Sequence, residues 1–301
     1  MFTKNVKIGL ALGGGGAKGS AHVGVMKVFD KYGIKPYAIA GTSAGSMLGA
    51  AFALGLSTDD VLKKSEAFNS SKFTKLSNFS PFGESLIKDK DINSVLRSVL
   101  GDAEFKDCKI PFFCIAVDLE SGKEVVLDSG KLWEACRASS AIPFIFTPVF
   151  LNSQYMVDGG ILNNVPVDVL KKRVPELDIT IGIELGSMTS RQYISGIVWK
   201  KYYSKPKAFT LAPGFFAKLK MNTTLMSHIM LRAIDIMREY TQEARFAQSK
   251  PDIIIKPKTE DISLLDFDRY REAVQAGVDA AEEAVPAILE LIEKKKNQLN
   301  G

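Results

Sequence analysis

Two successive strand-to-helix units at the start of the chain are the sequence feature that most constrains its fold. Residues 6–12 form a short apolar run that ends in four glycines, and apolar residues then recur at helical spacing over residues 18–32. Residues 37–40 form a second short strand, which leads through Gly41 into a helix rich in Ala, Leu and Gly that starts at Ser43. Strands that alternate with helices pair in parallel, so the sequence predicts an α/β fold with a mainly parallel central sheet.

Apolar runs and helical periodicity predict further elements along the chain. Strands are expected at residues 111–118, 123–127, 155–157, 179–185 and 253–255, and helices at residues 91–100, 131–139, 167–173, 223–247, 267–283 and 287–295. The polar stretch 70–90 is expected to be a loop that could cover a site. This pattern predicts one compact α/β domain with a helix-rich C-terminal extension, residues 186–301, that packs on the same domain.

Composition limits the class of protein. A chain of 301 residues, 46% of them hydrophobic, can bury a large core without disulfides or structural metals. Its three cysteines, Cys108, Cys114 and Cys136, are odd in number and lie in apolar surroundings, which favours free thiols in a reducing, cytoplasmic compartment. The first residues lack the pattern of a signal peptide, and no run of 18 apolar residues predicts a membrane span.

Positive charge is concentrated in one segment of the extension. Between Glu184 and Asp235 the chain has no acidic residue but eight basic ones, and aromatic residues are interleaved with them. This mixture is typical of a surface that contacts anionic lipid headgroups, so residues 191–220 are expected to make peripheral contact with the inner face of a membrane. A solvated basic loop is an equal alternative. Nucleic acid is disfavoured as a partner because no nucleic-acid motif accompanies the segment.

The turn at Ser43 matches a nucleophile motif. Gly41-Thr42-Ser43-Ala44-Gly45 fits the pattern Gly-x-Ser-x-Gly, in which small neighbours let the chain turn sharply and expose the serine hydroxyl. The dipole of the helix that begins here would favour a developing alkoxide. The alternative reading is a serine that merely caps the helix.

The first glycine loop has two candidate functions. Residues 14–19 contain Gly-x-Gly-x-x-Gly, which in a dinucleotide-binding protein would wrap a pyrophosphate. That function requires an acidic residue at the end of the second strand, where this chain has none, so no cofactor is expected. In an acyl hydrolase the same loop would present backbone N–H groups to an oxyanion, here those of Gly14, Gly15, Gly16 and Ala17. Lys18 would add positive potential near the site.

The predicted base is Asp158, which ends a short strand and precedes Gly159 and Gly160. This position puts the carboxylate at the edge of the sheet where a ligand crevice is expected. To act on a hydroxyl, the carboxylate needs partial desolvation and a direct contact with Ser43. The alternative reading is an ordinary turn aspartate.

The chain has two histidines that could act as the base instead. His22 lies on the first helix among Ala and Val residues and is expected to be packed rather than catalytic. His228 follows Ser43 and Asp158 in an order that would fit a Ser, Asp, His triad, but it lies in a Met-rich amphipathic helix without a turn signal. A triad is therefore the minor alternative to a dyad.

Three blocks in this order, residues 13–19, 41–45 and 158–160, resemble the patatin-like phospholipase family, with further similarity at residues 20–26, 138–143 and 163–167. The resemblance covers residues 6–185 and implies that they form a three-layer α/β/α catalytic domain. It also implies a dyad of Ser43 and Asp158 and hydrolysis of fatty acyl esters, in phospholipids, lysophospholipids or other lipids, without a metal ion. The residues that support the motifs are Lys18, Gly19, Gly41, Gly45, Gly159 and Gly160.

Two other classes of function stay open at this stage. A lipid-binding or regulatory protein could keep the same pocket and turn over little substrate. A nucleotide-dependent oxidoreductase depends on the glycine loop alone.

Overall fold

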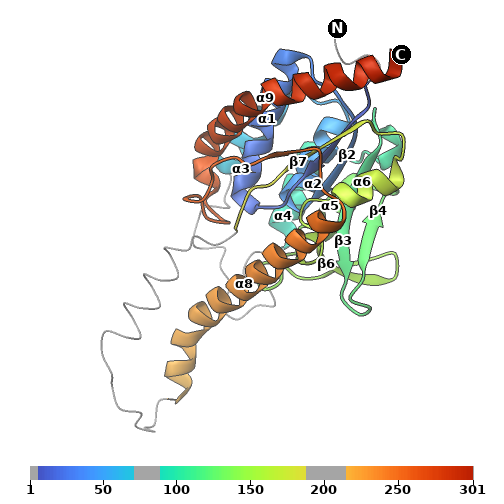
Figure 1. Cartoon of the computed structure of the whole chain (residues 1–301). Coiled ribbons are helices and arrows are strands. Elements are labelled where there is room, and N and C mark those ends of the chain that lie inside the picture. The colour runs from blue at the N-terminus through green and yellow to red at the C-terminus, as the bar shows by residue number, and fades with distance from the viewer. Residues whose placement is uncertain (1–5, 71–88, 188–214, 301) are drawn as a thin grey trace.

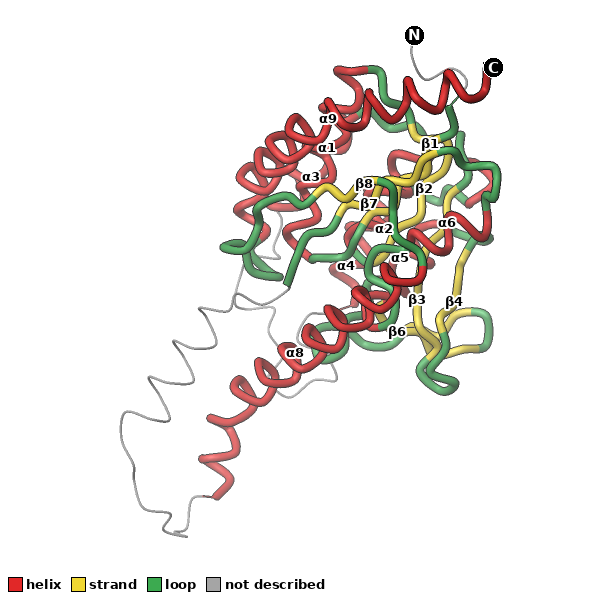
Figure 2. The backbone as a smooth tube through the Cα atoms, in the orientation of Figure 1, coloured by secondary structure: helices red, strands yellow, loops and turns green. Residues whose placement is uncertain are grey.

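One eight-stranded sheet forms the centre of the computed structural model, which describes residues 6–70, 89–187 and 215–300, with side chains for all of these except residues 65–70, 89–91, 215–228 and 300. The strands are β1 (Ile8–Leu12), β2 (Pro36–Thr42), β3 (Phe112–Asp118), β4 (Glu124–Leu127), β5 (Val149–Leu151), β6 (Gln154–Asp158), β7 (Ile179–Ile183) and β8 (Ile253–Ile255). Their order is β5-β6-β3-β2-β1-β7-β8, and β4 also pairs with β3. The strands, yellow in Figure 2, lie between the helices. The pairs β3–β2, β2–β1, β1–β7 and β7–β8 are parallel, whereas β4 and β6 pair antiparallel with β3 and β5 pairs antiparallel with β6, which confirms the mainly parallel sheet.

Helices cover both faces of this sheet. They are α1 (Ala21–Tyr32), α2 (Ala44–Ala53), α3 (Thr58–Ser70), α4 (Asp89–Leu100), α5 (Leu132–Ser139), α6 (Val167–Arg173), α8 (Phe215–Gln248) and α9 (Tyr270–Asn300), with short 3-10 turns η1 (Gly16–Ser20), η4 (Phe105–Asp107), η5 (Gly159–Ile161) and η7 (Phe267–Arg269). The larger core joins one face of the sheet to α1, α2, α4, α5 and α9. A smaller core joins the other face to α6 and to Phe246 of α8. The three-layer α/β/α fold is thereby confirmed.

Large and small side chains alternate along the central strands, and each size faces a different core. Ile8, Leu10 and Leu12 of β1 belong to the larger core, whereas Ala11 belongs to the smaller one. Successive side chains of a strand point to opposite faces, so the face toward α6 carries small side chains and the face toward α1 carries large ones. This asymmetry lets α6 approach the sheet closely on one side while most of the apolar surface is buried on the other.

Helix α9 lies alongside α1 (Figure 1), and two glycines allow the helices to touch. A Cβ atom on Gly24 would lie 2.0 Å from the carbonyl oxygen of Val274, and one on Gly277 would lie 2.0 Å from that of Ala21. Backbone therefore meets backbone at this crossing, with no room for a methyl group. This contact joins the extension to the first helix of the α/β unit, while the division into residues 6–185 and 186–301 stays a prediction.

The observed elements depart from the expected ones at α9 and at β5. Helix α9 runs unbroken through Pro286, where two helices were expected; Pro286 is exposed, so its ring faces solvent while α1 holds the helix on its other side. Strand β5 was not expected, because three residues carry too little periodicity; it pairs with β6 across a turn in which Asn152 and Ser153 have positive φ. Of the loop expected over residues 70–90, residues 71–88 lie outside the described residues.

We predict that Gly277→Ala lowers the free energy of unfolding by about 1–3 kcal/mol, because the new methyl group must push α9 away from α1. In an unobstructed helix, the replacement of Gly by Ala would instead raise the free energy of unfolding by about 1 kcal/mol, so the sign of the change tells whether the helices are in contact here. Urea denaturation measures the change. Glu283→Ala, at an exposed position of the same helix, serves as the control and should change stability by less than about 0.5 kcal/mol. A Gly277→Ala protein more stable than the wild type would contradict the close contact.

Candidate active site

Ser43 occupies the sharp turn between β2 and α2. Its φ of 54° and ψ of −123° lie in a region that non-glycine residues rarely adopt. The Ser43 N–H donates to the Ser139 hydroxyl at 2.8 Å, and the Thr42 hydroxyl donates to the Asn163 carbonyl at 2.8 Å. Ser43 occupies the N-cap position of α2, but its side chain makes no capping hydrogen bond to the helix.

The glycines around Ser43 are required because the turn packs against backbone. A Cβ atom on Gly41 would lie 2.4 Å from the Gly45 carbonyl oxygen, and one on Gly45 would lie 2.1 Å from the Leu12 carbonyl oxygen. A Cβ atom on Gly14 would lie 2.9 Å from Cβ of Ser43. The glycine loop and the serine turn are therefore in direct contact.

The other motif glycines are equally confined. A Cβ atom on Gly19 would lie 2.6 Å from Cβ of Ala44, at the start of α2. One on Gly159 would lie 2.3 Å from the Ile115 carbonyl oxygen, and one on Gly160 would lie 2.9 Å from Oδ1 of Asp158. Glycine at these positions lets η1 and η5 pack closely around the end of the sheet.

Asp158 is buried at the end of β6, beside Ser43. Its Oδ1 accepts a hydrogen bond from the Gly160 N–H at 2.7 Å. Burial raises the pKa of Asp158 to about 6, and the Ser43 hydroxyl, the Gly160 N–H and the charge of Arg238 partly offset that rise. A carboxylate with this pKa can act as a general base at neutral pH.

Ser43 and Asp158 line the same small hollow, together with Gly14, Gly15 and Arg238. The Ser43 hydroxyl is close enough to lower the pKa of Asp158, although Oδ2 has no partner that meets full hydrogen-bond geometry among the described residues. Contacts of this kind are often loose in a protein without substrate and tighten in the reacting complex.

The backbone N–H groups of the glycine loop divide into bonded and unbonded ones. The Gly14 N–H donates to Oδ1 of Asn164 at 3.2 Å, and the Ala17 N–H donates to the Leu264 carbonyl at 2.9 Å. In the described part of the chain, no acceptor takes a hydrogen bond from the N–H of Gly15 or Gly16. Of the four amides predicted for an oxyanion site, these two are available to a ligand.

Lys18 and His22 are both buried close to the glycine loop. The Lys18 ammonium donates to the Ser187 carbonyl at 2.5 Å, and burial lowers its pKa. His22 donates from Nε2 to the Gly13 carbonyl at 2.7 Å, and burial lowers its pKa to about 4. A neutral His22 thus holds the loop, as expected for a packed histidine. The side chain of His228, on α8, lies outside the described residues.

A second, larger cavity opens on the other side of Ser43. Its volume is about 130 Å³, and its wall is mainly apolar. Ser43, Gly16 and Ala17 form the end nearest the glycine loop. Much of the remaining wall comes from α2, α4 and the segment before α9, through Met47, Leu48, Ile92, Val95, Leu96, Leu264, Leu265 and Phe267, and further parts come from α3 (Val61 and Lys64) and from residues 140–146 (Ser140, Ile142 and Phe146). Ser43 therefore lines both the hollow that holds Asp158 and Arg238 and the apolar cavity.

Three residues around the site were not assigned a role from sequence: Ser139, Asn164 and Arg238. Ser139 and Asn164 fall in blocks that resemble the patatin-like family, so that similarity is the signal that could have found them. Arg238 lies in the extension, on α8, and carries no local pattern that marks it. Among the residues with described side chains, no group of three His, Cys, Asp or Glu is placed to hold a metal ion, and no described helix is long and apolar enough to cross a bilayer.

Comparison with known proteins gives the family. A family model described as patatin-like phospholipase matches residues 10–171. Lysophospholipase NTE1 of Candida albicans is 27% identical over 97% of this chain and 22% of its own length, and an NTE family protein of Mycobacterium tuberculosis is 27% identical over 95% of this chain and 47% of its own length.

This chain therefore spans a fifth to a half of these relatives. The crystal structure of VipD from Legionella pneumophila is similar over 96% of this chain and 67% of that one, with 13% identity and a TM-score of 0.46. Because the patatin model covers more than half of the residues, this chain belongs to the patatin-like phospholipase family.

Proposed function

We propose that this protein hydrolyses fatty acyl esters of lipids, as a phospholipase A or a lysophospholipase, through a dyad of Ser43 and Asp158. The observation that carries the proposal is the position of Ser43. It shares one hollow with a buried carboxyl of raised pKa and with Gly15, whose amide is unbonded among the described residues, and it lines an apolar cavity together with Gly16, whose amide is likewise unbonded. A lysophospholipase among the relatives supports the choice of substrate class.

The reaction would proceed in two steps. Asp158 accepts the Ser43 proton while Oγ bonds to the acyl carbon, and the N–H groups of Gly15 and Gly16 stabilise the oxyanion. The ester C–O bond then breaks, and the alcohol leaves with the proton from Asp158. In the second step water attacks the acyl-enzyme and gives a proton to Asp158, the fatty acid departs, and the proton returns to Ser43.

The two spaces beside Ser43 suggest how a substrate would lie. The apolar cavity suits a fatty acyl chain, because burial of each CH₂ group is worth about 0.8 kcal/mol. The hollow that holds Asp158 would then face the ester oxygen of the leaving alcohol. Because Gly16 and Ala17 belong to the cavity wall, a chain bound there would bring its carbonyl to the glycine loop.

The alternative function is a lipid-binding or regulatory protein with little turnover. Among the described residues, no group donates to Oδ2 of Asp158 and none accepts from the Gly15 or Gly16 N–H. This weighs against the alternative, because a pocket that only binds has no need of a buried carboxyl that destabilises the fold. We also propose that the extension, residues 186–301, completes the catalytic unit, since Leu264 and Arg238 contact the glycine loop.

Peripheral contact with a membrane is a further part of the proposal. The basic segment 191–220 lies mostly outside the described residues, but the described part of α8 has an inverted distribution of side chains. Its inner face is polar and buried, with Asp235, Arg238 and Gln242, whereas its outer face exposes Ile229, Met230, Ile236, Met237 and Tyr240. An outward apolar face next to an acidic-free, basic segment suits an anionic lipid surface at the inner face of a cytoplasmic membrane.

Removal of either dyad residue should eliminate ester hydrolysis while the protein stays folded. Ser43→Ala and Asp158→Asn are each expected to lower kcat by more than about 10³-fold on p-nitrophenyl esters, because nucleophile or base is lost. A fluorophosphonate should label Ser43 in the wild type. If His228→Ala is as damaging as Asp158→Asn, the base is part of a triad and the dyad is wrong.

The raised pKa of Asp158 predicts opposite effects on activity and stability. The folded pKa of about 6 exceeds the ordinary value of 3.8, so ionisation of Asp158 destabilises the fold as pH rises between these values, and the full penalty is present above about pH 6. Activity should therefore fall below about pH 6 as the base is protonated. Asp158→Asn should raise the free energy of unfolding by up to about 3 kcal/mol at pH 8 and by little below about pH 4. Equal stability of the two proteins at pH 8 would contradict the buried, ionised base.

Met237→Glu should weaken sedimentation with anionic vesicles by about 10-fold, because a charge replaces an apolar side chain that is 57% exposed on the outer face of α8. Leu299→Glu is the matched control: Leu299 is 54% exposed on α9, and its replacement should leave vesicle binding unchanged. Added salt should weaken wild-type binding if the basic segment contributes. Vesicle binding of the Met237→Glu protein equal to the wild type would remove α8 from the membrane contact.

A further inference from the structure

Arg238 brings a buried positive charge from the extension into the candidate active site. It is 4% exposed and lines the hollow that holds Ser43 and Asp158. A Cβ atom on Gly160 would lie 3.5 Å from Cδ of Arg238, so the side chain passes directly over the turn that follows Asp158. Such a cation could bind an anionic substrate or could hold the protein backbone, and its contacts separate these roles.

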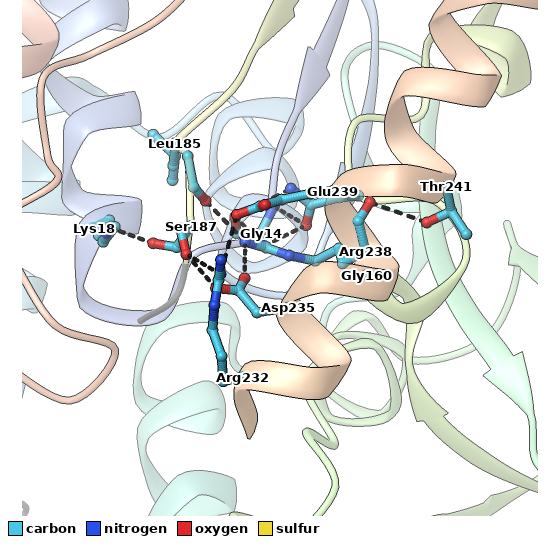
Figure 3. A network of polar contacts seen from close by, with 12 residues as sticks. Gly14, Lys18, Gly160, Leu185, Ser187, Arg232, Asp235, Arg238, Glu239 and Thr241 are labelled. Carbon is cyan, nitrogen blue, oxygen red and sulfur yellow. Dashed lines mark hydrogen bonds and ion pairs between the residues drawn. The ribbon is translucent and has the colours of Figure 1, made fainter. Parts of the chain in front are cut away.

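The guanidinium is occupied by protein acceptors (Figure 3). Nη1 donates to the Gly14 carbonyl at 3.4 Å and to Oδ1 of Asn164 at 3.1 Å, and Nη2 donates to the Gly186 carbonyl at 2.8 Å and to Oδ1 of Asp235 at 2.9 Å. Each terminal nitrogen carries two N–H bonds and has two acceptors. These donors are therefore spent on the protein, which disfavours a phosphate-binding role.

The contact with Gly14 affects the orientation of the next amide. The Gly14 carbonyl and the Gly15 N–H belong to one planar trans peptide and point in opposite directions. Asn164 holds the N–H of Gly14 through the same Oδ1 that accepts from Arg238, so the preceding peptide is fixed as well. A donor that holds the Gly14 oxygen thereby sets the direction of the Gly15 N–H.

We propose that Arg238 is a positioning residue that orients the Gly14–Gly15 peptide so that the Gly15 N–H meets the oxyanion formed at Ser43. The inference rests on the proposed acyl hydrolysis and adds to it a residue that never touches the substrate. Arginine suits the role because its planar fork reaches several carbonyl and carboxylate oxygens at once, which a lysine ammonium cannot do with the same geometry.

Asp235 keeps this arginine in place. It is fully buried, pairs with Nη2 of Arg238 at 2.9 Å and with Nη1 of Arg232 at 3.0 Å, and accepts a hydrogen bond from the Ser187 hydroxyl. The two charges are thus compensated inside the protein. Loss of one partner of such a pair is strongly destabilising, so a test needs variants that preserve one charge or the other.

The main test compares Arg238→Lys with Arg245→Lys on p-nitrophenyl butyrate, a neutral ester without phosphate. Arg245 lies on the same helix and pairs with Glu124 and Asp168, away from the hollow, so its replacement should leave kcat unchanged. Arg238→Lys keeps the charge but loses the fork, and kcat should fall between about 10-fold and 100-fold with KM nearly constant. Equal kcat in Arg238→Lys and wild type, or a rise in KM alone, would overturn the proposal.

The pH profile gives a readout that a purely structural role would not move. Arg238 faces Asp158 from α8 and favours its ionised form, the Gly160 N–H from η5 donates to Asp158, and the nearby Ser43 hydroxyl from the β2–α2 turn lowers the pKa of Asp158. Arg238→Gln should therefore move the acid limb of kcat to higher pH, whereas Arg238→Lys should not. Asp235→Asn, which leaves Arg238 in place, should lower kcat less than Arg238→Lys and move the acid limb to lower pH.

Thermal melts of every variant show whether it is folded. If both Arg238 variants unfold, Asp235→Asn provides the test. An unchanged kcat and pH profile in Asp235→Asn would then overturn the proposal. Ser43→Ala distinguishes a failure of the proposed function from a failure of the proposed role of Arg238. If Ser43→Ala keeps full activity, the proposed function fails; if it is inactive while Arg238→Lys is fully active, only the role of Arg238 fails.

Discussion

Close contact between two glycine-containing turns is the constraint on which the rest of the site depends. Strands β1 and β2 pair in parallel with Leu12 opposite Gly41, so both turns begin at the same edge of the sheet. A Cβ atom on Gly45 would overlap the Leu12 carbonyl, and the positive φ of Ser43 costs about 1–3 kcal/mol, which the surrounding hydrogen bonds must offset. The strain at Ser43 is tolerated because the hydrogen bonds of Ser139 and Thr42 and the contact with the glycine loop hold the backbone in this conformation.

Sequence could predict which segments meet but not which atoms are already bonded. The order of strands and glycine turns predicted that the loop at residues 13–19, the turn at Ser43 and Asp158 meet, because all three follow or end strands of a mainly parallel sheet. They do meet, but β6 runs antiparallel to β3, so the rule for parallel strands does not place Asp158. Its position follows from the register, in which Asp158 pairs with Ala116, next to the Ile115 that pairs with Thr42. The same reasoning treated the amides from Gly14 to Ala17 as equivalent. The N–H groups of Gly14 and Ala17 donate to Asn164 and to the Leu264 carbonyl, which lie far along the chain. No local sequence pattern encodes contacts at that distance. Arg238 escaped prediction for the same reason, as one basic residue of a long helix.

Buried charge is a recurring cost of this arrangement. Asp158 is held at a raised pKa, Lys18 at a lowered one, and Asp235 and Arg238 form an ion pair with almost no solvent contact. Pairs of this kind stabilise a fold little, because desolvation cancels most of the attraction. Their concentration around one loop, while the cores on both faces of the sheet are apolar, fits a site in which stability is given up for geometry.

Helix α8 connects the proposed membrane contact with the proposed role of Arg238, because exposed apolar residues and buried polar residues alternate along it. Ile236 and Met237 are exposed, whereas the neighbouring Asp235 and Arg238 are buried, so the proposed membrane contact and the hold on the glycine loop lie on opposite faces of one helix. Arg238 also donates to the Gly186 carbonyl, just beyond β7, and to Asn164, just beyond η5. The same guanidinium therefore ties α8 to the ends of two segments of the sheet region. A displacement of α8 would have to break those bonds together, which favours a helix that would meet a lipid surface as a rigid body with its site already formed.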